Sequence, residues 1–367
     1  MWIQGPRPTL GPILRSLRWQ RGWTLRQMSE RTHRRIAKPV VVGLFLFMAA
    51  GAPSFARPAP APDTFDILQQ NAWDLKTSDK EASLYITELG HGPTVIVLHG
   101  GPGQDFHYLV DAVRPNSGRF RFILFDQRGS VLSPISEAKT KALTMAKLVD
   151  DLETLRKALG EGKVILMAHS AGNALAMAYY KAHPDHVKGL VLADSQPPGL
   201  ETPEWDKAFA ARRDAQIHRP EVQTTLAAAG LDKDPAQLTP HQRDQQWRLT
   251  HLIPMDVYRH ERWRRFEGGG AWYNADAAEA ISGATDPAVC DIAGVLAAHP
   301  VPITVIDGDH DFIDPSGAGW RSLAAEHPEI RIFPLKNAGH YSWIDNPEGF
   351  DRSLRAGLER AAASSRP

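Results

Sequence analysis

Short runs of mainly apolar residues recur along the chain from residue 94 onwards, and most of them end at a glycine, an aspartate or a small polar turn. Runs of this kind predict strands that are buried on both faces of a parallel sheet. The pattern predicts strands at 94–99, 120–125, 164–168, 187–192, 303–306 and 330–333, of which those at 94–99 and 164–168 are expected to be fully buried.

Segments with helical spacing separate several of these runs. Residues 144–159 place apolar side chains at helical intervals and stop at Gly160, and residues 171–181 are rich in small residues. A glycine directly after the last periodic residue is a common helix stop. Strands that alternate with helices predict an α/β fold, with a mostly parallel sheet and helices on both of its faces.

The stretch at 198–298 interrupts this alternation. It contains several tryptophans and many charged residues, and few of its segments resemble strands. It falls between the fourth and fifth predicted strands, so we expect an inserted helical cap. The α/β core is then expected in two parts, at 64–197 and at 299–367.

The first 40 residues are strongly basic, and an apolar run follows at 40–50. Ser54 and Ala56 supply small residues at the −3 and −1 positions of a cleavage site. This arrangement predicts a signal peptide over 1–56 with an extended basic region, cleaved after Ala56. We therefore expect a periplasmic or extracellular protein.

The apolar run is shorter than the roughly 20 residues that a bilayer span needs. Membrane contact is thus expected only through the signal peptide, and an uncleaved anchor is the alternative. Residues 57–63 are rich in proline and predict an extended spacer. Residues 14–28 resemble the opening of a helix-turn-helix repressor domain, but the apolar run begins before a recognition helix could form. We interpret residues 1–27 as an over-long start or an extended basic region.

Charge and cysteine content narrow the possible functions. Lys+Arg 42 balances Asp+Glu 42, so the formal net charge is +0, which argues against a nucleic-acid partner. The single cysteine, Cys290, cannot form an intrachain disulfide and does not suffice for a typical structural zinc site. We interpret Cys290 as a small buried hydrophobe. The sequence implies no metal or organic cofactor, and it does not predict an oligomeric state.

A serine lies where a predicted strand meets a predicted helix. Residues 167–172 read Met-Ala-His-Ser-Ala-Gly, which matches the nucleophile elbow G-x-S-x-G except that Ala168 replaces the first glycine. Such a turn needs small neighbours, because the nucleophile adopts a strained backbone conformation. We predict that Ser170 is the nucleophile, and a serine that caps the helix is the alternative.

A serine hydroxyl needs a histidine base that a carboxylate orients. In one large class of α/β enzymes, the acid and then the histidine follow the serine along the chain. The loop after the fifth predicted strand offers four carboxylates, Asp307, Asp309, Asp311 and Asp314. The pattern G-x-x-D-x-x-x-P at 308–315 favours Asp311, and Asp309 is the second choice.

The turn after the sixth predicted strand supplies His340, which we predict to be the base. His310 is expected to make a local loop contact, and His169 is expected to be a packed neighbour of the nucleophile. The oxyanion of a tetrahedral intermediate needs N–H donors. We assign these to the backbone of Ala171, directly after the nucleophile, and of Gly101 in the glycine-rich turn after the first strand.

Two further motifs carry a family resemblance. The segments His-Gly-Gly-Pro-Gly at 99–103 and Asp-Gln-Arg-Gly at 126–129 resemble the proline iminopeptidase family of α/β-hydrolases, over residues 80–196 and 299–350. The resemblance implies release of an N-terminal residue, often proline, under a cap whose acidic residues bind the free amine. The candidates for this amine anchor are Glu204, Glu261 and Glu267, and a solvated surface charge is the favoured alternative for each.

The chain departs from that family in two places. The family has Gly-Gly-Ser-Trp-Gly-Ser at the elbow, where this chain has Ala-His-Ser-Ala-Gly-Asn, and Val131 replaces the second glycine of D-Q-R-G-x-G-x-S. Two hypotheses follow: a secreted serine aminopeptidase that forms an acyl-enzyme, or a carboxylesterase or amide hydrolase on the same scaffold. Both act on a small peptide or ester substrate. A carboxylate in the cap, about one dipeptide from Ser170, would distinguish the aminopeptidase.

Overall fold

The structure is a computed structural model, and it describes residues 64–101, 103–197, 203–266, 274–284 and 291–364. The predicted signal peptide and spacer, together with Glu267 and Cys290, lie outside the described residues. Within the described ranges, no helix combines the length and the apolar character that a membrane span requires.

The described strands form one eight-stranded sheet in the order β1-β2-β4-β3-β5-β6-β7-β8. Antiparallel pairing joins β1 to β2 and β2 to β4, and all other neighbours pair in parallel. The mostly parallel sheet and its six predicted strands are confirmed. The bounds of the strands are β1 Trp73–Lys76, β2 Ser83–Gly90, β3 Thr94–Leu98, β4 Arg121–Phe125, β5 Val164–His169, β6 Val187–Ala193, β7 Ile303–Gly308 and β8 Ile330–Leu335.

The first two strands were not predicted from the apolar runs. Buried and half-buried positions alternate along most of β2, so it lacks the continuous apolar run of a strand that is covered on both faces. Alternation over 83–89 is a period-two signal that a half-covered antiparallel strand gives instead. The edge of the sheet formed by β1 and β2 is therefore antiparallel, whereas the strands from β4 to β8 pair in parallel.

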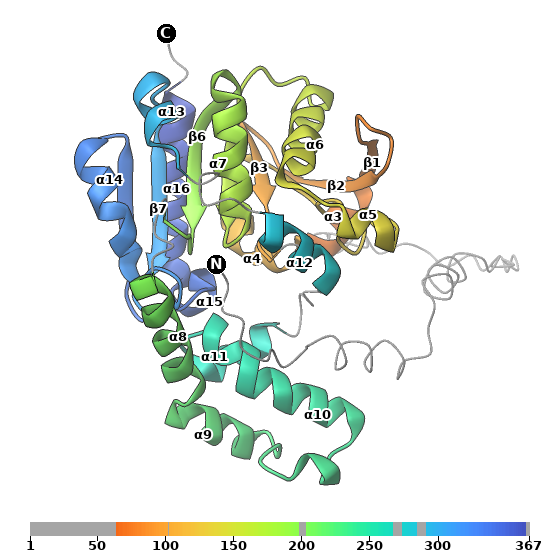
Figure 1. Cartoon of the computed structure of the whole chain (residues 1–367), viewed down its shortest axis with the longest axis vertical. Helices are drawn as coiled ribbons and strands as arrows, with labels where there is room; N and C mark the ends of the chain where they lie inside the picture. The colour runs from red at the N-terminus through yellow and green to blue at the C-terminus, as the bar shows by residue number, and fades with distance from the viewer. Residues whose placement is uncertain (1–63, 102, 198–202, 267–273, 285–290, 365–367) are drawn as a thin grey trace, which may run out of the picture. The chain divides into compact units, whose positions relative to one another are not determined.

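Helices cover both faces of the sheet (Figure 1). The central strands send alternate side chains into two separate buried clusters, one on each face; in β5, for example, Ile165 and Met167 enter the first cluster, while Leu166 and Ala168 enter the second. The helices of the core are α3 Thr64–Gln70, α4 Val110–Val113, α5 Glu137–Lys141, α6 Met145–Ala158, α7 Gly172–Ala182, α14 Arg321–Glu326, α15 Ser342–Asp345 and α16 Pro347–Ala363.

An insertion of helices separates β6 from β7. Its first helices stand off the carboxyl end of the sheet (Figure 1), and they are α8 Pro203–Ile217, α9 Pro220–Ala228, α10 Pro240–Trp247, η5 Arg248–Leu252, α11 Ile253–Asp256 and η6 His260–Phe266. The last two, α12 Ala275–Ala284 and α13 Ala293–Ala298, return to the core, because Ile281 and Leu296 belong to a buried cluster of the sheet. We use "cap" below for α8 to η6.

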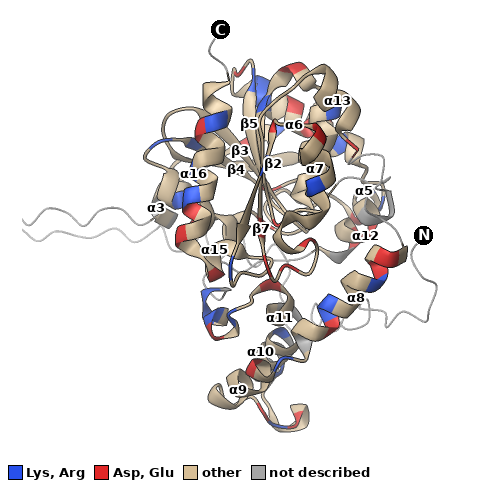
Figure 2. Cartoon of the chain, turned by 90° about the vertical axis from the view of Figure 1, so that its left-hand side faces the viewer, with Lys and Arg blue, Asp and Glu red and all other residues tan. Residues whose placement is uncertain are grey.

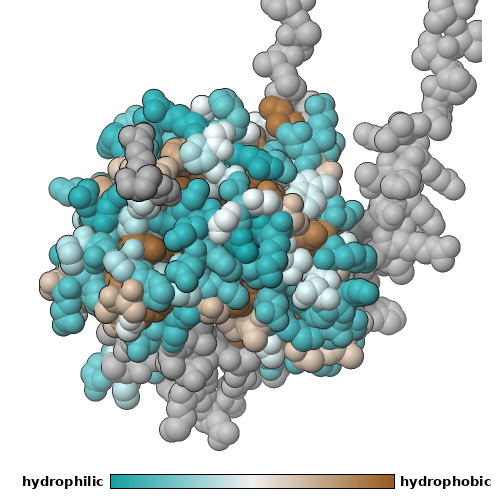
Figure 3. All heavy atoms as spheres, turned by 90° about the horizontal axis from the view of Figure 1, so that it is seen from above, coloured by the Kyte–Doolittle hydropathy of each residue, from teal (hydrophilic) through white to brown (hydrophobic). Residues whose placement is uncertain are grey.

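The exterior of the described chain is polar. Lys, Arg, Asp and Glu mix along the outer sides of helices such as α8 and α16 (Figure 2), and the face seen from above is mostly hydrophilic (Figure 3). Among the described residues, Leu132 is the one large hydrophobic side chain that is exposed, at 40%. An apolar docking surface is therefore not found on the described part of the molecule.

A buried guanidinium joins three parts of the core. Arg128, from the Asp-Gln-Arg-Gly segment after β4, donates from Nε and Nη2 to the two carboxylate oxygens of Asp151 in α6, each at 2.6 Å. Its Nη1 donates to Asp79, in the turn between β1 and β2, at 2.7 Å. Because Arg128 and Asp151 are both buried, each charge depends on the other for compensation.

We predict that Arg128→Met will lower the free energy of unfolding by about 3–5 kcal/mol, because it leaves the Asp151 carboxylate buried without a partner. Urea denaturation followed by circular dichroism measures the change. The control is Lys141→Met, which removes an exposed ion pair with Glu137 and should cost less than about 1 kcal/mol. Equal effects of the two substitutions would contradict the role assigned to Arg128.

Candidate active site

Ser170 occupies a sharp turn between β5 and α7. Its φ is 53°, in the left-handed region that most residues avoid. The turn leaves no space for side chains on two neighbours: a Cβ on Gly172 would lie 2.5 Å from the carbonyl oxygen of Leu98, and one on Gly100 would lie 2.7 Å from the Ser170 Cβ. The methyl group of Ala168, at the first glycine position of the motif, packs into a buried cluster on one face of the sheet. The geometry is that of a nucleophile elbow.

The three predicted residues of the triad come together at this turn. The Nε2 atom of His340 lies 2.9 Å from the Ser170 hydroxyl, and its Nδ1 atom lies 3.2 and 3.3 Å from the two carboxylate oxygens of Asp311. Asp311 and His340 are both buried. This arrangement can transfer the hydroxyl proton to an imidazole whose other nitrogen is held by a carboxylate.

Electrostatics favour a proton on the imidazole. Burial alone would lower the pKa of His340, but the negative charges of Asp311 and Asp256 and the hydrogen bond with Asp311 raise it above its usual value. An imidazole with a raised pKa accepts a proton from serine more readily. It must still be neutral at the start of the reaction, so activity is expected to fall when the pH drops through this raised pKa.

The other residues considered for these roles make different contacts. Asp309 contacts the ring of His310 at 2.6 Å and accepts from the Ala338 N–H, and it makes no contact with His340. His310 therefore has the local loop contact that the sequence predicts. His169 is fully buried next to Ser170, in contact with the ring of His340.

Two backbone N–H groups next to Ser170 are free to bind an oxyanion. Within the described residues, neither the Gly101 N–H nor the Ala171 N–H has a hydrogen-bond partner. Gly101 adopts a φ of 46°. The neighbouring Gly100 N–H is already used, because it donates to the Tyr108 hydroxyl at 2.6 Å. These observations agree with the choice of Gly101 and Ala171 as donors.

A set of buried carboxyl groups lies behind the triad. Oxygens of Asp194, Asp307 and Asp311 lie within 4.8 Å of one another. Burial, together with the charge of Asp311, raises the pKa of Asp194 and of Asp307 well above the usual carboxyl range. Protonation of these two groups relieves the repulsion that three adjacent carboxylates would create. Asp311 differs from both because it alone contacts the imidazole of His340.

A second group of potential metal ligands lies away from the triad, where Glu153, His183 and His186 approach one another. The Glu153 carboxylate already accepts hydrogen bonds from Arg156 and from the Tyr179 hydroxyl. A guanidinium on the same carboxylate opposes a metal cation. We interpret this group as a structural link between α6 and α7.

The cap places a carboxylate beside the triad, and sequence patterns did not indicate this carboxylate. Asp256, the last residue of α11, is half-buried and is close enough to His340 for each charge to shift the pKa of the other. Burial raises the pKa of Asp256 to about 7, and the charge of His340 opposes this increase. Within the described residues, the Asp256 carboxylate has no hydrogen-bond partner.

Backbone contacts fix Asp256 relative to His340. The carbonyl oxygen of Asp256 accepts from the Tyr341 N–H at 2.8 Å. The loop at 336–341, called the histidine loop below, carries His340. The buried Asp345 carboxylate accepts the N–H groups of Gly339 in this loop and of Tyr258 and Arg259 in the cap, each at 2.8 Å. The cap segment that carries Asp256 is thus bound directly to the loop that carries the base.

The three anchors proposed from sequence do not share this position. Glu204, in the first turn of α8, and Glu261, in η6, are both exposed. Glu267 lies outside the described residues. No local motif marks Asp256, because its closeness to His340 depends on how the cap folds back over the sheet.

The fold and the site define a hydrolase of the α/β class, and comparison with known proteins agrees. A family model described as "alpha/beta hydrolase fold" matches residues 93–347. This match covers more than half of the chain, so the chain belongs to the α/β-hydrolase fold family.

Within this family the chain is similar to proline iminopeptidases. It is 38% identical to the enzyme of Xylella fastidiosa over 118 residues, which are 31% of this chain and 36% of that enzyme. It thus matches only about a third of the length of that relative. It is 25% identical to the enzyme of Lactobacillus helveticus over 284 residues, which are 75% of this chain and 92% of that enzyme.

Solved structures share the fold. A proline iminopeptidase-related protein from Thermus thermophilus aligns with a TM-score of 0.58 and 24% identity, covering 80% of this chain and 98% of that one. An esterase from Thermogutta terrifontis aligns with a TM-score of 0.56 and 21% identity, covering 79% and 98%. The fold is common to a peptidase-related protein and an esterase, so it does not by itself define the substrate.

We predict that Asp311→Asn will lower kcat by up to about 10⁴-fold, because an amide cannot hold the imidazole in the required tautomer. Asp309→Asn is the matched control and should change kcat less than about threefold, since its carboxylate faces His310. Steady-state kinetics of the two variants on any substrate that the wild type hydrolyses make the comparison. A larger loss for the Asp309 variant would reassign the acid.

Proposed function

We propose that the protein is a serine aminopeptidase that releases an N-terminal residue from a peptide, as proline iminopeptidases do, through an acyl-enzyme intermediate. The observation that carries this proposal is the position of Asp256, a carboxylate of the cap that lies beside His340 and has no hydrogen-bond partner among the described residues. Similarity to curated proline iminopeptidases supports the same conclusion.

The proposed reaction begins when the Ser170 hydroxyl oxygen attacks the carbonyl carbon of the first residue. Its proton passes to Nε2 of His340, which lies 2.9 Å away, while Asp311 stabilises the imidazolium. The Gly101 and Ala171 N–H groups donate to the oxyanion. The C–N bond then breaks, and the leaving amine takes the proton from Nε2. Water, deprotonated by His340, hydrolyses the resulting ester and regenerates Ser170.

In this proposal Asp256 pairs with the ammonium group of the substrate. The carboxylate lies close to the base that acts on the first peptide bond, so only a short stretch of substrate fits between ammonium and scissile carbonyl. An unpaired charge at a site shielded from water costs several kcal/mol, and a charged hydrogen bond contributes about 1.5–3 kcal/mol. A chain with a blocked amine lacks this interaction, and the enzyme would act as an exopeptidase.

Aromatic rings next to the base favour an apolar first residue. The ring of Phe312 lies 4.8 Å from that of His340, Phe209 lies 5.5 Å from Phe312, and Trp205 stacks on Phe209 at 5.1 Å, each between ring centroids. The series begins at the triad and continues into helix α8 of the cap. Its rings provide apolar surface on which a pyrrolidine ring such as that of proline can pack.

We predict that acetylation of the substrate amine will lower kcat/KM by about 10- to 100-fold, which corresponds to about 1.5–3 kcal/mol. The comparison uses proline p-nitroanilide, its N-acetyl form and p-nitrophenyl acetate, with Ser170→Ala as the background. Asp256→Asn should remove the preference for the free amine and lower the rate on the ester far less, since the ester loses only the effect of Asp256 on the pKa of His340. Asp232→Asn, which removes an exposed carboxylate elsewhere in the cap, is the matched control.

The dependence of kcat/KM on pH should also differ between the free amine and the ester. Below about pH 7, kcat/KM for the free amine should fall more steeply than for the ester, because both Asp256 and His340 must be deprotonated for the former and His340 alone for the latter. Equal rates on free and acetylated substrates, or hydrolysis of esters alone, would establish the carboxylesterase alternative. A loss confined to Glu204→Gln or Glu261→Gln would move the anchor to that residue.

We further propose that the protein acts outside the cytoplasm. The support is the sequence alone: a basic region, an apolar run at 40–50, and small residues at Ser54 and Ala56. The proline-rich residues 57–63 would then separate the processed end from the folded enzyme.

We predict that the exported protein begins at Arg57. Intact-mass and N-terminal peptide mass spectrometry of the periplasmic and medium fractions of an expressing bacterium measure this directly. A matched variant, Ala56→Arg, should block cleavage, because the −1 position requires a small residue. Recovery of the full-length chain in the cytoplasm alone would refute the proposal.

A further inference from the structure

A series of hydrogen bonds passes through buried side chains behind Ser170. The Gly100 N–H donates to the Tyr108 hydroxyl at 2.6 Å, and that hydroxyl lies 2.9 Å from Nδ1 of His169. The Nε2 atom of His169 lies 2.9 Å from the carbonyl oxygen of His340. One end of the series is the loop that carries Gly101, and the other end is the catalytic base itself.

Hydrogen-bonding rules fix where the protons lie. A carbonyl oxygen can only accept, so Nε2 of His169 must carry the ring proton and donate it to His340. In a neutral imidazole the other nitrogen then accepts, so the Tyr108 hydroxyl donates to Nδ1 and accepts from the Gly100 N–H. Each donor in the series therefore has one acceptor, and no polar atom of the three contacts is left without a partner.

His169 stays neutral throughout this arrangement. Burial and the nearby charge of His340 lower the pKa of His169 well below its usual value. The nearest carboxylate is Asp194, at 4.0 Å from Nε2, and burial keeps the pKa of that group high. A neutral His169 can keep the same tautomer while His340 gains and loses its proton.

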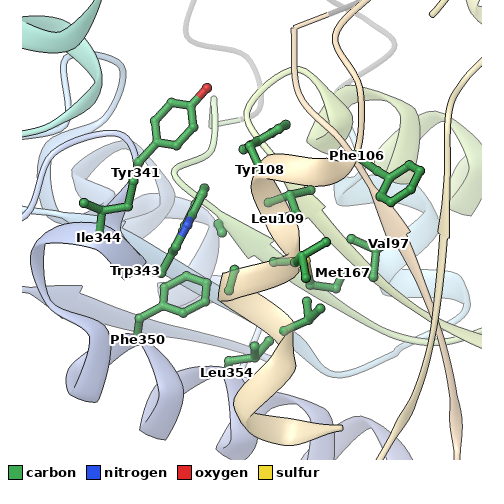
Figure 4. Packing of buried hydrophobic residues seen from close by; sticks show 14 of the residues in the cluster. Val97, Phe106, Tyr108, Leu109, Met167, Tyr341, Trp343, Ile344, Phe350 and Leu354 are labelled. Atoms are coloured by element: carbon green, nitrogen blue, oxygen red, sulfur yellow. The ribbon is translucent and has the colours of Figure 1, made fainter. Parts of the chain in front are cut away.

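Rings enclose His169 on several sides. The ring centroids of Tyr108, Tyr341, Trp343 and His340 lie 5.4, 5.0, 4.9 and 4.8 Å from its own. Figure 4 shows Tyr108, on the segment that leads into α4, near Tyr341, next to His340, and Trp343 of α15. Such packing limits the rotamers of His169 and excludes the water that would compete for its hydrogen bonds.

We propose that Tyr108 and His169 are positioning residues that hold the Gly101 N–H and the His340 imidazole in register on either side of Ser170. The inference rests on the proposed role of Ser170 as the nucleophile. Asp345 and Asp256 fix the residues on each side of His340, whereas His169 fixes residue 340 itself. Oxyanion donors act only within a narrow range of distance, and a shift of about 1 Å can cost about 100-fold in rate.

The test measures the rate at which a fluorophosphonate inactivates the enzyme. This reagent needs the nucleophile, the base and the oxyanion donors, but it needs no amine anchor. Tyr108→Phe should lower the second-order rate constant by about 10- to 100-fold, which is less than the roughly 10²- to 10³-fold loss from removing a donor outright. The matched control is Tyr180→Phe, which removes another hydrogen-bonded hydroxyl, one that donates to the His299 carbonyl away from the site.

Two variants of His169 distinguish positioning from packing. His169→Gln keeps an amide N–H that can donate to the His340 carbonyl, whereas His169→Leu has similar bulk and no donor. We expect the glutamine variant to be inactivated at least about tenfold faster than the leucine variant. Thermal unfolding of each protein shows whether a lost rate merely follows lost stability, and Tyr108→Phe and Tyr180→Phe should melt at similar temperatures.

The outcomes separate this inference from the proposed function. Wild-type rates in Tyr108→Phe and His169→Leu, with Ser170→Ala unreactive, would overturn the positioning role and leave the serine hydrolase intact. Equal losses in the glutamine and leucine variants would assign His169 to packing alone and overturn the inference as well. A wild type that does not react, or a Ser170→Ala variant that reacts equally, would overturn the proposed function itself and this inference with it.

Discussion

Ser170, with a φ of 53°, lies in the two-residue turn between the end of strand β5 at His169 and the start of helix α7 at Gly172. A non-glycine residue in this region costs on the order of 1–3 kcal/mol, which its surroundings must offset. The Ser170 N–H donates to the Ala193 carbonyl, and the Asn173 side chain donates to the carbonyls of both Ser170 and Ala193. The ends of β5 and β6 are thereby held together, and the serine hydroxyl is presented beyond the edge of the sheet. The close approach of Gly100 and Gly172 to this turn then brings in the loop after β3, so the oxyanion donors depend on the same constraint.

The position of the cap on the core is fixed largely through the histidine loop. One buried carboxylate, Asp345, collects N–H groups from both sides of the junction, and the Asp256 carbonyl adds a direct bond to Tyr341. On the other side, Arg212 and Gln216 of α8 donate to carbonyls of the loop that carries Asp311. The cap thus contacts the loops that carry Asp311 and His340. Backbone hydrogen bonds thus set the position of a cap carboxylate relative to the base, as the proposed aminopeptidase would require.

Sequence patterns predicted the parts of the site that depend on local structure. Ser170 directly follows the buried strand β5, His340 follows the turn after β8, and Asp311 follows β7 within a recognisable loop, so the parallel sheet alone brings them to one edge. Asp256 was not predicted because its own segment contains no recognisable motif. Only the tertiary fold of the cap places it beside His340. The hydrogen-bond partners of His169 were not predicted for the same reason, although its packing beside the nucleophile was expected. The hairpin of β1 and β2 was missed because its apolar positions alternate, whereas the strands at the centre of the sheet have continuous apolar runs.

In the proposed aminopeptidase, the choice between peptide and ester depends on the state of Asp256 before substrate binds. Its raised pKa means that the protein stabilises the ionised carboxylate less well than water does, since burial removes solvent and the described residues supply no hydrogen bond in its place. Under this proposal an ammonium group that enters the site supplies the missing hydrogen bond, so part of the binding free energy would come from relief of an unfavourable free state. A neutral ester cannot provide this relief and leaves the carboxylate as it was. Discrimination against blocked or neutral substrates therefore requires no steric clash, because an incompletely satisfied charge in the free enzyme is sufficient.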